Sequence, residues 1–330
     1  MRTIAIVFLS GLLCFASAQA ANLNARQEVS DFIDYMVEKH RFERGELDHL
    51  FAATQFQQPI IDAISRPAEA LPWHKYRQIF VKPDRIQLGT EFWRQNAQTL
   101  ARAEQEFGVP PQIITAIIGV ETRYGQHKGK HRVMDALATL AFGYPKRSAF
   151  FKSELEHYLL LTRDEGIEPL SLTGSYAGAM GIPQFISSSY RAYAVDFDDD
   201  GLRDLWSNPT DAIGSVANYF KQHGWIKGEQ VVVPATVESD DYQMVLKRGI
   251  KPHTAIAEFA HYKIAVNGAV GQDMLGALIE LEQSDHKEHW VGLENFYAIT
   301  RYNHSPLYAM AVYQLSQEIK KAWEKETNPS

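Results

Sequence analysis

The sequence predicts a mainly helical globular protein of the α+β class, with one small β-containing insertion. Apolar residues recur at helical spacing through much of the chain, glycine and proline mark the ends of those stretches, and β-branched runs become frequent after Gly224. The chain has 330 residues, of which 45% are hydrophobic. A chain of this size has enough apolar residues to fill the cores of about two domains.

The N-terminal part is expected to be helical. The predicted helices span 27–39, 44–51 and 90–107, and the last one is closed by Gly108. Between them, the segment 66–85 is rich in proline and aromatic residues, which favours an extended segment that wraps the body of the protein.

More helices are predicted in the middle of the chain. Besides the apolar stretch 113–121, they span 132–142, 148–165 and 209–223, the last one with Asn208 as its N-cap. The β-branched runs that suggest a small mixed insertion are 230–233, 262–266 and 274–281. Helix returns from Leu293, and 305–325 is expected to form a long amphipathic closing helix.

The first 20 residues have the build of a cleavable secretory signal, with Arg2, an apolar run over 4–15 and small residues up to Ala20. The run is too short for a membrane span, which takes about 20 apolar residues. Cys14 is the only cysteine and lies inside this signal, and Leu13 before it departs from the small residue that lipid-anchor sites usually have. We therefore expect a periplasmic protein without a transmembrane helix, and a lipid anchor is not expected.

Charge and composition exclude several classes of function. Arg2 is the only charged residue of the signal, so its removal changes the net charge from −7 to −8, which argues against a nucleic-acid partner. The 12 histidines are scattered without the paired spacing of zinc ligands, and no serine nucleophile elbow is present.

Glu121 is the strongest catalytic candidate because it continues an apolar helical stripe that should face inward. The stripe residues seven, four and three positions before it are Ile114, Ile117 and Ile118. Burial and the negative end of the helix dipole, with Gly125 as the expected helix terminator, both raise the pKa of such a carboxyl group. Glu121 would then be a general acid near neutral pH. The alternative is a surface ion pair with a cation such as Arg123.

Small residues dominate the segment 174–185, which lets its backbone lie close to a ligand or to another helix. Ser175, Gln184 and Phe185 offer the combination of hydrogen-bonding groups and flat apolar surface that binds sugars. Tight helix packing is an equally good explanation of the same composition.

Acidic residues alternate ahead of a glycine in the segment 196–201, as in the first half of an EF-hand calcium loop. The second half matches less well, because Ser207 stands where a bidentate carboxylate belongs, although Asp204 and Asp211 lie near. A weak or structural cation site is favoured over a solvated acidic turn.

Taken together, several separated motifs resemble the membrane-bound lytic murein transglycosylase B family. The segments that carry the resemblance are 119–125, 174–190, 196–206, 211–219 and 301–308, in this order. The resemblance implies a lysozyme-like catalytic core over 106–228, preceded by the signal 1–20 and a helical N-terminal domain over 21–105. It also implies a small α+β insertion over 229–292 and C-terminal helices over 293–330 that complete the fold.

The resemblance also implies the reaction. Family members cleave the β-1,4 bond between N-acetylmuramic acid and N-acetylglucosamine in peptidoglycan, and the muramyl C6 hydroxyl closes a 1,6-anhydro end. The implied partner is therefore a peptidoglycan glycan strand, and other cell-wall enzymes are further expected partners. No cofactor is implied for the chemistry.

The family's functional residues fall on matching positions of this chain. Its catalytic acid falls on Glu121, and its glycan-binding positions fall on Ser175, Gln184, Phe185, Tyr219, Tyr302, Asn303 and Tyr308. A further stretch that contacts sugar or peptide falls on Lys146, Arg147 and Phe150, and here a lysine stands where relatives often have the planar fork of arginine. The cation loop, for structural calcium or sodium, falls on Asp196, Asp198, Asp200 and Leu202.

One carboxyl group can suffice for this reaction. Hydrolases of glycosidic bonds usually need two acids, one for the leaving oxygen and one for water or carbon. An internal hydroxyl nucleophile removes the second requirement and makes the step unimolecular. Two alternatives stay open, namely a lysozyme-type hydrolase that uses an acid of 196–204 and a non-catalytic peptidoglycan-binding protein.

Overall fold

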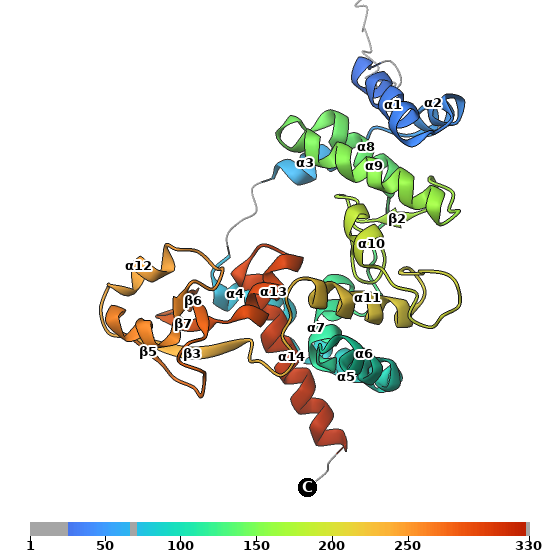
Figure 1. The fold of residues 1–330 in the computed structure, drawn as a ribbon. Helices are drawn as coiled ribbons and strands as arrows, with labels where there is room; N and C mark the ends of the chain where they lie inside the picture. The colour runs from blue at the N-terminus through green and yellow to red at the C-terminus, as the bar shows by residue number, and fades with distance from the viewer. Residues whose placement is uncertain (1–25, 67–70, 328–330) are drawn as a thin grey trace, which may run out of the picture.

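The computed structural model describes residues 26–66 and 71–327, which form a helical body with a small sheet at one side (Figure 1). The first seven helices are α1 (Gln27–His40), α2 (Arg44–Ala53), α3 (Gln58–Ser65), α4 (Trp73–Phe80), α5 (Pro83–Gln95), α6 (Ala97–Phe107) and α7 (Pro111–Thr122). The later helices are α8 (Val133–Gly143), α9 (Ser148–Asp164), α10 (Ser187–Tyr193), α11 (Pro209–Gln222), α12 (Tyr242–Leu246), α13 (Glu294–Tyr302) and α14 (Pro306–Thr327), with 3-10 turns η2 (Pro145–Arg147) and η3 (Ile256–Tyr262).

The segment 66–85 is not extended, so that prediction is wrong for its described part. It holds α4 and the start of α5, with Pro72 directly before the first helix and Pro83 at the first position of the second. Proline favours both of these positions because it lacks the N–H that a helix start leaves unpaired. The prolines therefore mark helix starts rather than an extended chain.

The predicted long helix over 90–107 is two helices. Asn96 leaves the helical conformation, with φ −118° and ψ 24°, and its side-chain amide donates to the Phe92 carbonyl at 2.8 Å. An asparagine that bonds the backbone in this way competes with the helix ladder, which explains the break. The predictions also missed α3 and α10.

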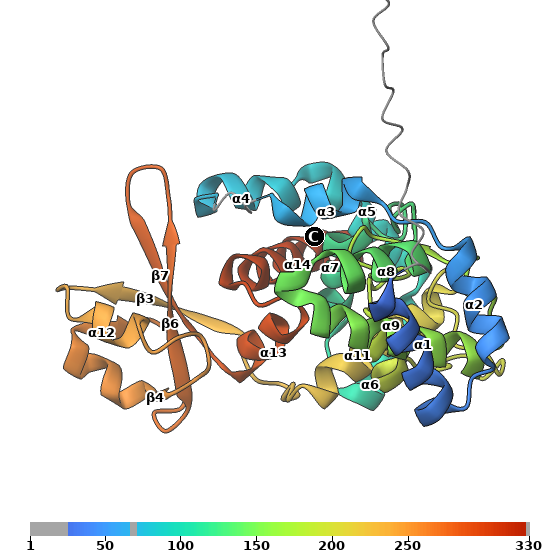
Figure 2. The same cartoon turned by 90° about the horizontal axis from the view of Figure 1, so that it is seen from above.

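The insertion is an antiparallel sheet in the order β4-β6-β7-β3-β5 with its own hydrophobic cluster. Its strands are β3 (Val232–Val237), β4 (Thr254–Ala255), β5 (Ile264–Val266), β6 (Leu275–Glu282) and β7 (Lys287–Gly292). The β-branched runs predicted three of these strands, β3, β5 and β6, whereas the two-residue β4 and the more polar β7 were not predicted. Seen from above, the sheet stands beside the helical body, with α13 and α14 between them (Figure 2). The division of the chain into domains stays a prediction.

The closing helix α14 is central to the body. It packs against α4, α5, α7 and α13, so the C-terminal helix joins elements from the first third of the chain to the middle of the chain. Buried side chains from α1 to α14 belong to one continuous hydrophobic cluster. Within the described residues, no helix is long and apolar enough to cross a membrane, and the predicted signal with Cys14 lies outside them.

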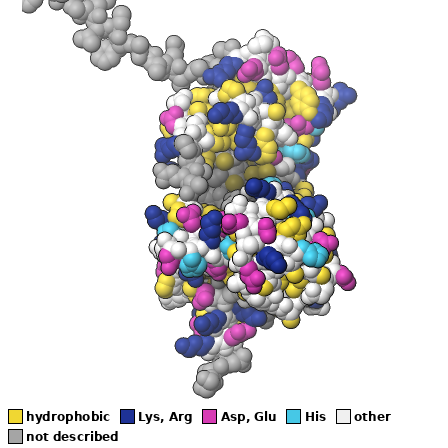
Figure 3. Space-filling view, turned by 90° about the vertical axis from the view of Figure 1, so that its left-hand side faces the viewer, with side chains coloured by type: hydrophobic (Ala, Val, Ile, Leu, Met, Phe, Trp, Pro, Cys, Tyr) yellow, Lys and Arg dark blue, Asp and Glu magenta, His cyan; other side chains and the backbone are white. Residues whose placement is uncertain are grey.

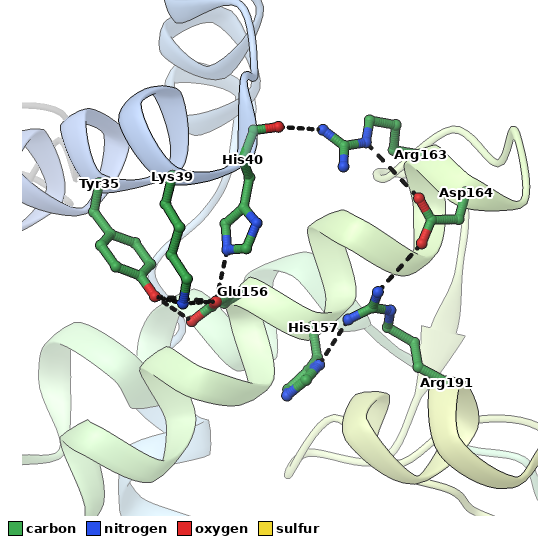
Figure 4. Close-up of polar contacts among 8 residues, drawn as sticks. All are labelled: Tyr35, Lys39, His40, Glu156, His157, Arg163, Asp164 and Arg191. Atoms are coloured by element: carbon green, nitrogen blue, oxygen red, sulfur yellow. Dashed lines mark hydrogen bonds and ion pairs between the residues drawn. The ribbon is translucent and has the colours of Figure 1, made fainter.

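A polar joint fixes α1 to α9 (Figure 4). Glu156 of α9 accepts hydrogen bonds from the Tyr35 hydroxyl at 3.1 Å and from Lys39 Nζ at 3.0 Å, and His40 Nε2 lies 2.7 Å from it. Arg163 reaches back from α9 and donates to the His40 carbonyl at 2.7 Å. One carboxylate therefore collects three side chains of the N-terminal helix.

Candidate active site

Glu121 lies in the last turn of α7, on the inward stripe that the sequence predicts. Ile114, Ile117 and Ile118 are fully buried, whereas Glu121 itself is partly exposed. Arg123 pairs with Asp84, its Nη2 lying 2.9 Å from the carboxylate oxygen, so the alternative of a surface pair between Glu121 and Arg123 is wrong. The carboxyl group of Glu121 is thus free for another partner.

The helix ends earlier than expected. Arg123 already has a left-handed conformation, with φ 51°, so Gly125 is not the helix terminator that the sequence suggested. The Arg123 N–H donates to the Gly119 carbonyl and the Tyr124 N–H to the Ile118 carbonyl, which satisfies the last carbonyls of the helix. Glu121 therefore stands one residue before the end of α7, next to a left-handed turn.

Tyr308, at the start of α14, is the partner of Glu121. Its hydroxyl donates to Glu121 Oε1 at 2.5 Å across 187 positions of sequence, and its side chain is 3% exposed. Burial raises the pKa of Glu121, and the hydrogen bond from the Tyr308 hydroxyl offsets part of this rise. The result of both effects is a pKa of about 7. Burial and the charge of Glu121 hold the pKa of Tyr308 well above its usual range, so the hydroxyl stays a donor.

Aromatic side chains surround this pair. Tyr302 donates its hydroxyl to the Pro183 carbonyl at 2.6 Å, and its ring centroid lies 4.8 Å from that of Tyr219 and 5.9 Å from that of Phe185. Tyr219 donates to the Arg301 carbonyl at 2.6 Å. The structure thus brings Glu121 and four of the predicted binding residues, Phe185, Tyr219, Tyr302 and Tyr308, into one aromatic cluster linked through the 174–185 segment and α13.

The glycines of the 174–185 segment are explained by packing. Gly178 has φ 80°, and a Cβ there would lie 2.5 Å from Leu137; a Cβ on Gly181, at φ 69°, would lie 2.4 Å from the Leu205 carbonyl oxygen. Ser175 Oγ accepts the Ala179 N–H at 3.0 Å, which leaves its own hydroxyl proton available. Gln184, also left-handed with φ 53°, donates to the Gly181 carbonyl at 2.9 Å.

The other predicted residues are less closely tied to Glu121. Asn303 is exposed at the C-cap of α13. Lys146 and Arg147 lie in η2, and the Arg147 guanidinium lies 4.2 Å from the ring centroid of Phe150, which is 37% exposed. None of the contacts described for these residues reaches the Glu121 cluster.

The carboxylates that come together in the acidic loop are not the predicted set, because Asp211 takes the place of Asp200 and Leu202. Carboxylate oxygens of Asp196, Asp198 and the buried Asp211 lie within 4.8 Å of one another. Asp200 instead accepts the Leu202 N–H at 2.8 Å, and Leu202 is 58% exposed. Burial and the neighbouring acids raise the pKa of Asp211, although it accepts the N–H groups of Phe197 and Asp204. These three carboxylates could hold an oxygen-seeking cation.

Sequence reasoning missed two side chains beside Glu121. Tyr76 of α4 lies near enough for the charge of Glu121 to raise its pKa, although burial is the larger cause. Tyr124 packs under the last turn of α7 and donates to the Arg85 carbonyl at 2.8 Å. Tyr124 stood in the motif around Glu121, whereas Tyr76 lay in the segment misread as extended.

The surface is hollowed on the side of the insertion (Figure 3). The hollow separates an upper part, which holds α3, α8 and α9, from a lower part with α4, α13 and the sheet, and hydrophobic side chains gather along its upper wall. α4 and α13 supply Tyr76 and Tyr302, so the aromatic cluster belongs to the lower part.

A carboxyl group with a raised pKa beside aromatic side chains is typical of the general acid of glycan-cleaving enzymes. The model of the transglycosylase SLT domain family matches residues 24–317. The membrane-bound lytic murein transglycosylase B of Escherichia coli K12 is 45% identical over 313 residues, which cover 92% of this chain and 84% of the relative.

Solved structures of lytic transglycosylases match the fold of this chain as well. The catenated lytic transglycosylase SltB1 of Pseudomonas aeruginosa superposes with a TM-score of 0.88 at 50% identity and covers 91% of this chain and 99% of its own. The Escherichia coli lytic transglycosylase Slt35 in complex with calcium gives 0.84 at 45% identity, covering 91% and 94%. The chain belongs to the transglycosylase SLT family and is a lytic transglycosylase that cleaves peptidoglycan. The lysozyme-like fold that the resemblance implied is confirmed.

Proposed function

We propose that this enzyme cleaves the β-1,4 bond between N-acetylmuramic acid and N-acetylglucosamine with Glu121 as its single acid and base, leaving a 1,6-anhydromuramic end. The observation that carries the proposal is the environment of Glu121. Its carboxyl group is partly buried, has one hydroxyl partner, and has a pKa of about 7. A group with this pKa holds a proton at neutral pH in half of the molecules and can give it up and take it back.

The proton returns to Glu121 in the course of the reaction. Protonated Glu121 gives its proton to the glycosidic oxygen as the bond from that oxygen to the muramyl anomeric carbon breaks. The resulting carboxylate accepts the proton of the C6 hydroxyl as that oxygen bonds the same carbon. Tyr308 donates to the carboxylate in the charged state between the two transfers. No water is consumed, so the products together weigh the same as the substrate.

The hydrolase alternative needs a second carboxylate within about 10 Å of the first. Among the described residues, the hydrogen-bond partner of the Glu121 carboxyl group is the Tyr308 hydroxyl, which is not a carboxylate. The acids of the 196–204 loop are instead engaged with backbone N–H groups of their own loop, as at Asp196 and Asp204. These contacts favour an internal nucleophile.

The substrate is proposed to lie in the hollow of Figure 3, against the aromatic cluster. Ser175, Gln184, Tyr302 and Asn303 keep surface for direct contact, whereas Phe185 and Tyr308 are nearly fully buried and shape the wall from beneath. Tyr219 supports Tyr302, and Lys146, Arg147 and Phe150 contact a more distant part of the strand or its peptide. A related enzyme, SltB3 of Pseudomonas aeruginosa, 30% identical with a TM-score of 0.77, was solved with NAG-anhNAM-pentapeptide.

The acidic loop is proposed to bind a structural calcium ion, with sodium as the alternative, and takes no part in the chemistry. Oxygen ligands are what calcium prefers, and Asp196, Asp198 and Asp211 supply three of them. Calcium should raise the melting temperature and a chelator should lower it. Asp198→Asn should remove most of this response, while Asp273→Asn, at an exposed carboxylate of the insertion, should retain it. A melting temperature that ignores calcium in the wild type would contradict the site.

The periplasm is the proposed location, because the N-terminal pattern is that of an exported chain and the substrate lies there. Other cell-wall enzymes are proposed partners on the same ground. Cell fractionation tests the location: the periplasmic fraction should hold the processed chain, and retention in the cytoplasm would contradict it.

Mass analysis of muropeptides tests the reaction. Wild-type digestion of purified peptidoglycan should give disaccharide products one water lighter than hydrolysis products and without a reducing muramyl end. Products of hydrolytic mass would support the lysozyme-type alternative. Glu121→Gln should still bind peptidoglycan and release almost nothing; a variant as active as the wild type would leave only the non-catalytic role or another acid.

A further inference from the structure

The turn that follows Glu121 is unusual in its backbone. Arg123, Tyr124 and Gly125 have φ values of 51°, 60° and 83°, so three successive residues are left-handed. Residues other than glycine rarely adopt this conformation, and two in a row persist only where the surroundings hold them. Because Glu121 lies two residues before this turn, whatever holds the turn also holds the acid.

Tyr124 is the side chain that occupies the space under the turn. It fits between two glycines, since a Cβ on either Gly89 of α5 or Gly119 of α7 would lie 2.5 Å from its hydroxyl oxygen. Its hydroxyl donates to the Arg85 carbonyl at 2.8 Å, and its ring centroid lies 5.7 Å from that of Phe92. Gly89 and Gly119 thus form a notch for Tyr124, and no residue larger than glycine fits at either position while the Tyr124 ring stays in place.

Arg85 completes a cross-brace between α5 and α7. Its Nη1 donates to the Gly119 carbonyl at 2.6 Å, in the last turn of α7, while its own carbonyl receives the Tyr124 hydroxyl. Burial raises the pKa of Tyr124, so the hydroxyl remains a neutral donor over the working range of pH. The end of α7 is thus attached to α5 by two reciprocal hydrogen bonds.

The other side of the turn is attached to the glycan-binding wall. Thr122, fully buried, donates its hydroxyl to the Ile182 carbonyl at 2.8 Å and accepts the Gly125 N–H at 2.9 Å. Glu121 is therefore the residue directly before a junction where α5, α7 and the 174–185 segment meet. A shift of this junction moves the carboxyl group relative to Tyr308.

We propose that Tyr124, seated between Gly89 and Gly119 and bonded to Arg85, is a positioning residue that holds the Glu121 carboxyl group in its catalytic place. The residue touches no substrate and acts through the end of α7. This inference rests on the proposed role of Glu121. Reacting groups must be held within fractions of an ångström, so a loosened brace slows the chemical step more than it weakens substrate binding.

A pair of matched variants tests the proposal. Tyr124→Phe removes only the hydroxyl bond to the Arg85 carbonyl, and Tyr158→Phe removes the same kind of bond, from a buried tyrosine of α9 to the Pro169 carbonyl at 2.6 Å. Both variants should fold and lose similar amounts of thermal stability. Only Tyr124→Phe should lower kcat, by about tenfold with KM unchanged, which corresponds to about 1.4 kcal/mol in the barrier.

The pH profile of kcat/KM gives a readout that a purely structural role would not move. The groups facing Glu121 from the packed elements are the tyrosines Tyr308, Tyr302 and Tyr76. Loosening their packing admits water, so the pKa seen in the profile of Tyr124→Phe should fall from about 7 toward the ordinary 4.5 of a glutamate. The profile of Tyr158→Phe should match that of the wild type.

A double-mutant cycle shows whether the glycine notch acts through the tyrosine. Gly119→Ala should impair kcat in the wild type, where its Cβ displaces the ring, and should cost little more in a Tyr124→Ala background. The proposal is overturned if Tyr124→Phe behaves like Tyr158→Phe. It is also overturned if the effects of Gly119→Ala and Tyr124→Ala on kcat are additive. An active Glu121→Gln would instead contradict the role of Glu121, so the two failures are distinguishable.

Discussion

Two glutamates of this enzyme, Glu121 and Glu156, are both partly buried and yet have opposite properties. The pKa of Glu121 is raised to about 7, whereas that of Glu156 is lowered below its usual range. Burial acts in the same direction on both, because it disfavours the charged carboxylate. The difference lies in the donors: among the described residues, Glu156 is met by Tyr35, Lys39 and His40 (Figure 4), whereas Glu121 is met by Tyr308 alone.

The comparison shows how the same type of side chain serves a catalytic purpose at Glu121 and a structural purpose at Glu156. Three donors, two of them able to carry positive charge, favour the charged form of the carboxylate that fixes α1 to α9. A single neutral hydroxyl leaves the carboxyl group poised between its two protonation states. The number and charge of the donors therefore decide between a structural glutamate and a catalytic one, and each variant below changes one side of that comparison.

The largest expected effect is on turnover. Glu121→Gln should lose about 10³-fold in the rate of muropeptide release, because general acid–base catalysis typically contributes about 10²–10⁴-fold. Glu156→Gln is the matched control and should release muropeptides at the wild-type rate. Equal losses in the two variants would mean that the comparison does not separate catalysis from structure.

The same substitution at Glu121 should alter stability in the opposite direction. Since the folded-state pKa of about 7 lies above the ordinary 4.5, the contribution of Glu121 to wild-type stability is fully present below pH 4.5 and is lost as the pH rises through 7. The gap corresponds to up to about 3 kcal/mol. Glutamine cannot ionise, so the unfolding free energy of Glu121→Gln relative to wild type should rise by up to this amount between pH 4 and pH 8.

Urea unfolding at the two pH values measures this difference. A free-energy difference between variant and wild type that stays constant with pH would show that Glu121 is not held in its neutral form. Such a trade between stability and activity is common at active sites.

Tyr308→Phe should have an intermediate effect. It removes the only described donor to the Glu121 carboxyl group, so the pKa of that group should rise above about 7. The carboxylate formed in the reaction also loses a hydrogen bond, which should slow kcat by about tenfold, or about 1.4 kcal/mol. The pH profile of kcat/KM measures both changes, and a profile displaced toward acid would refute the assigned direction.

Glu156→Gln should give the smallest effect, confined to stability. Because the folded-state pKa of Glu156 is lowered, its contribution is present above the ordinary 4.5 and disappears as the pH falls through the folded-state value. Lys39 is 53% exposed, so its ion pair contributes little. We expect a loss of about 1 kcal/mol at pH 7 that decreases as the pH falls below 4.5, measured by denaturant unfolding. A loss that does not change with pH would show that packing, not charge, is responsible.

Local sequence signals predicted much of the fold because they act within a few residues. Periodicity and caps located most helices, and Asn208 does cap α11 by accepting the Thr210 N–H at 2.9 Å. The errors arose where one residue type is compatible with two local structures. Pro83 suggested an extended chain but starts α5, and Asn96 looked like an ordinary helical residue but separates two helices.

The site was predictable only in part. The isoleucine stripe was enough to turn Glu121 inward and to predict the direction of its pKa. The identity of its partner could not be predicted from periodicity, because Tyr308 lies 187 positions away and only packing of α14 on α7 brings the two residues together. The resemblance placed Tyr308 among glycan-binding residues, which stays a prediction, and it gave no sign of the hydrogen bond from Tyr308 to the acid. Periodicity likewise gave no sign that Tyr124 fills the notch between Gly89 and Gly119.

Titration of the Glu121 side-chain carboxyl carbon by NMR, with Glu121→Gln to assign the signal, tests the central claim most directly. We predict a midpoint of about 7 in the uncomplexed enzyme. A midpoint near 4.5, the ordinary value, would show a carboxylate already ionised at neutral pH and would contradict its role as the single proton donor.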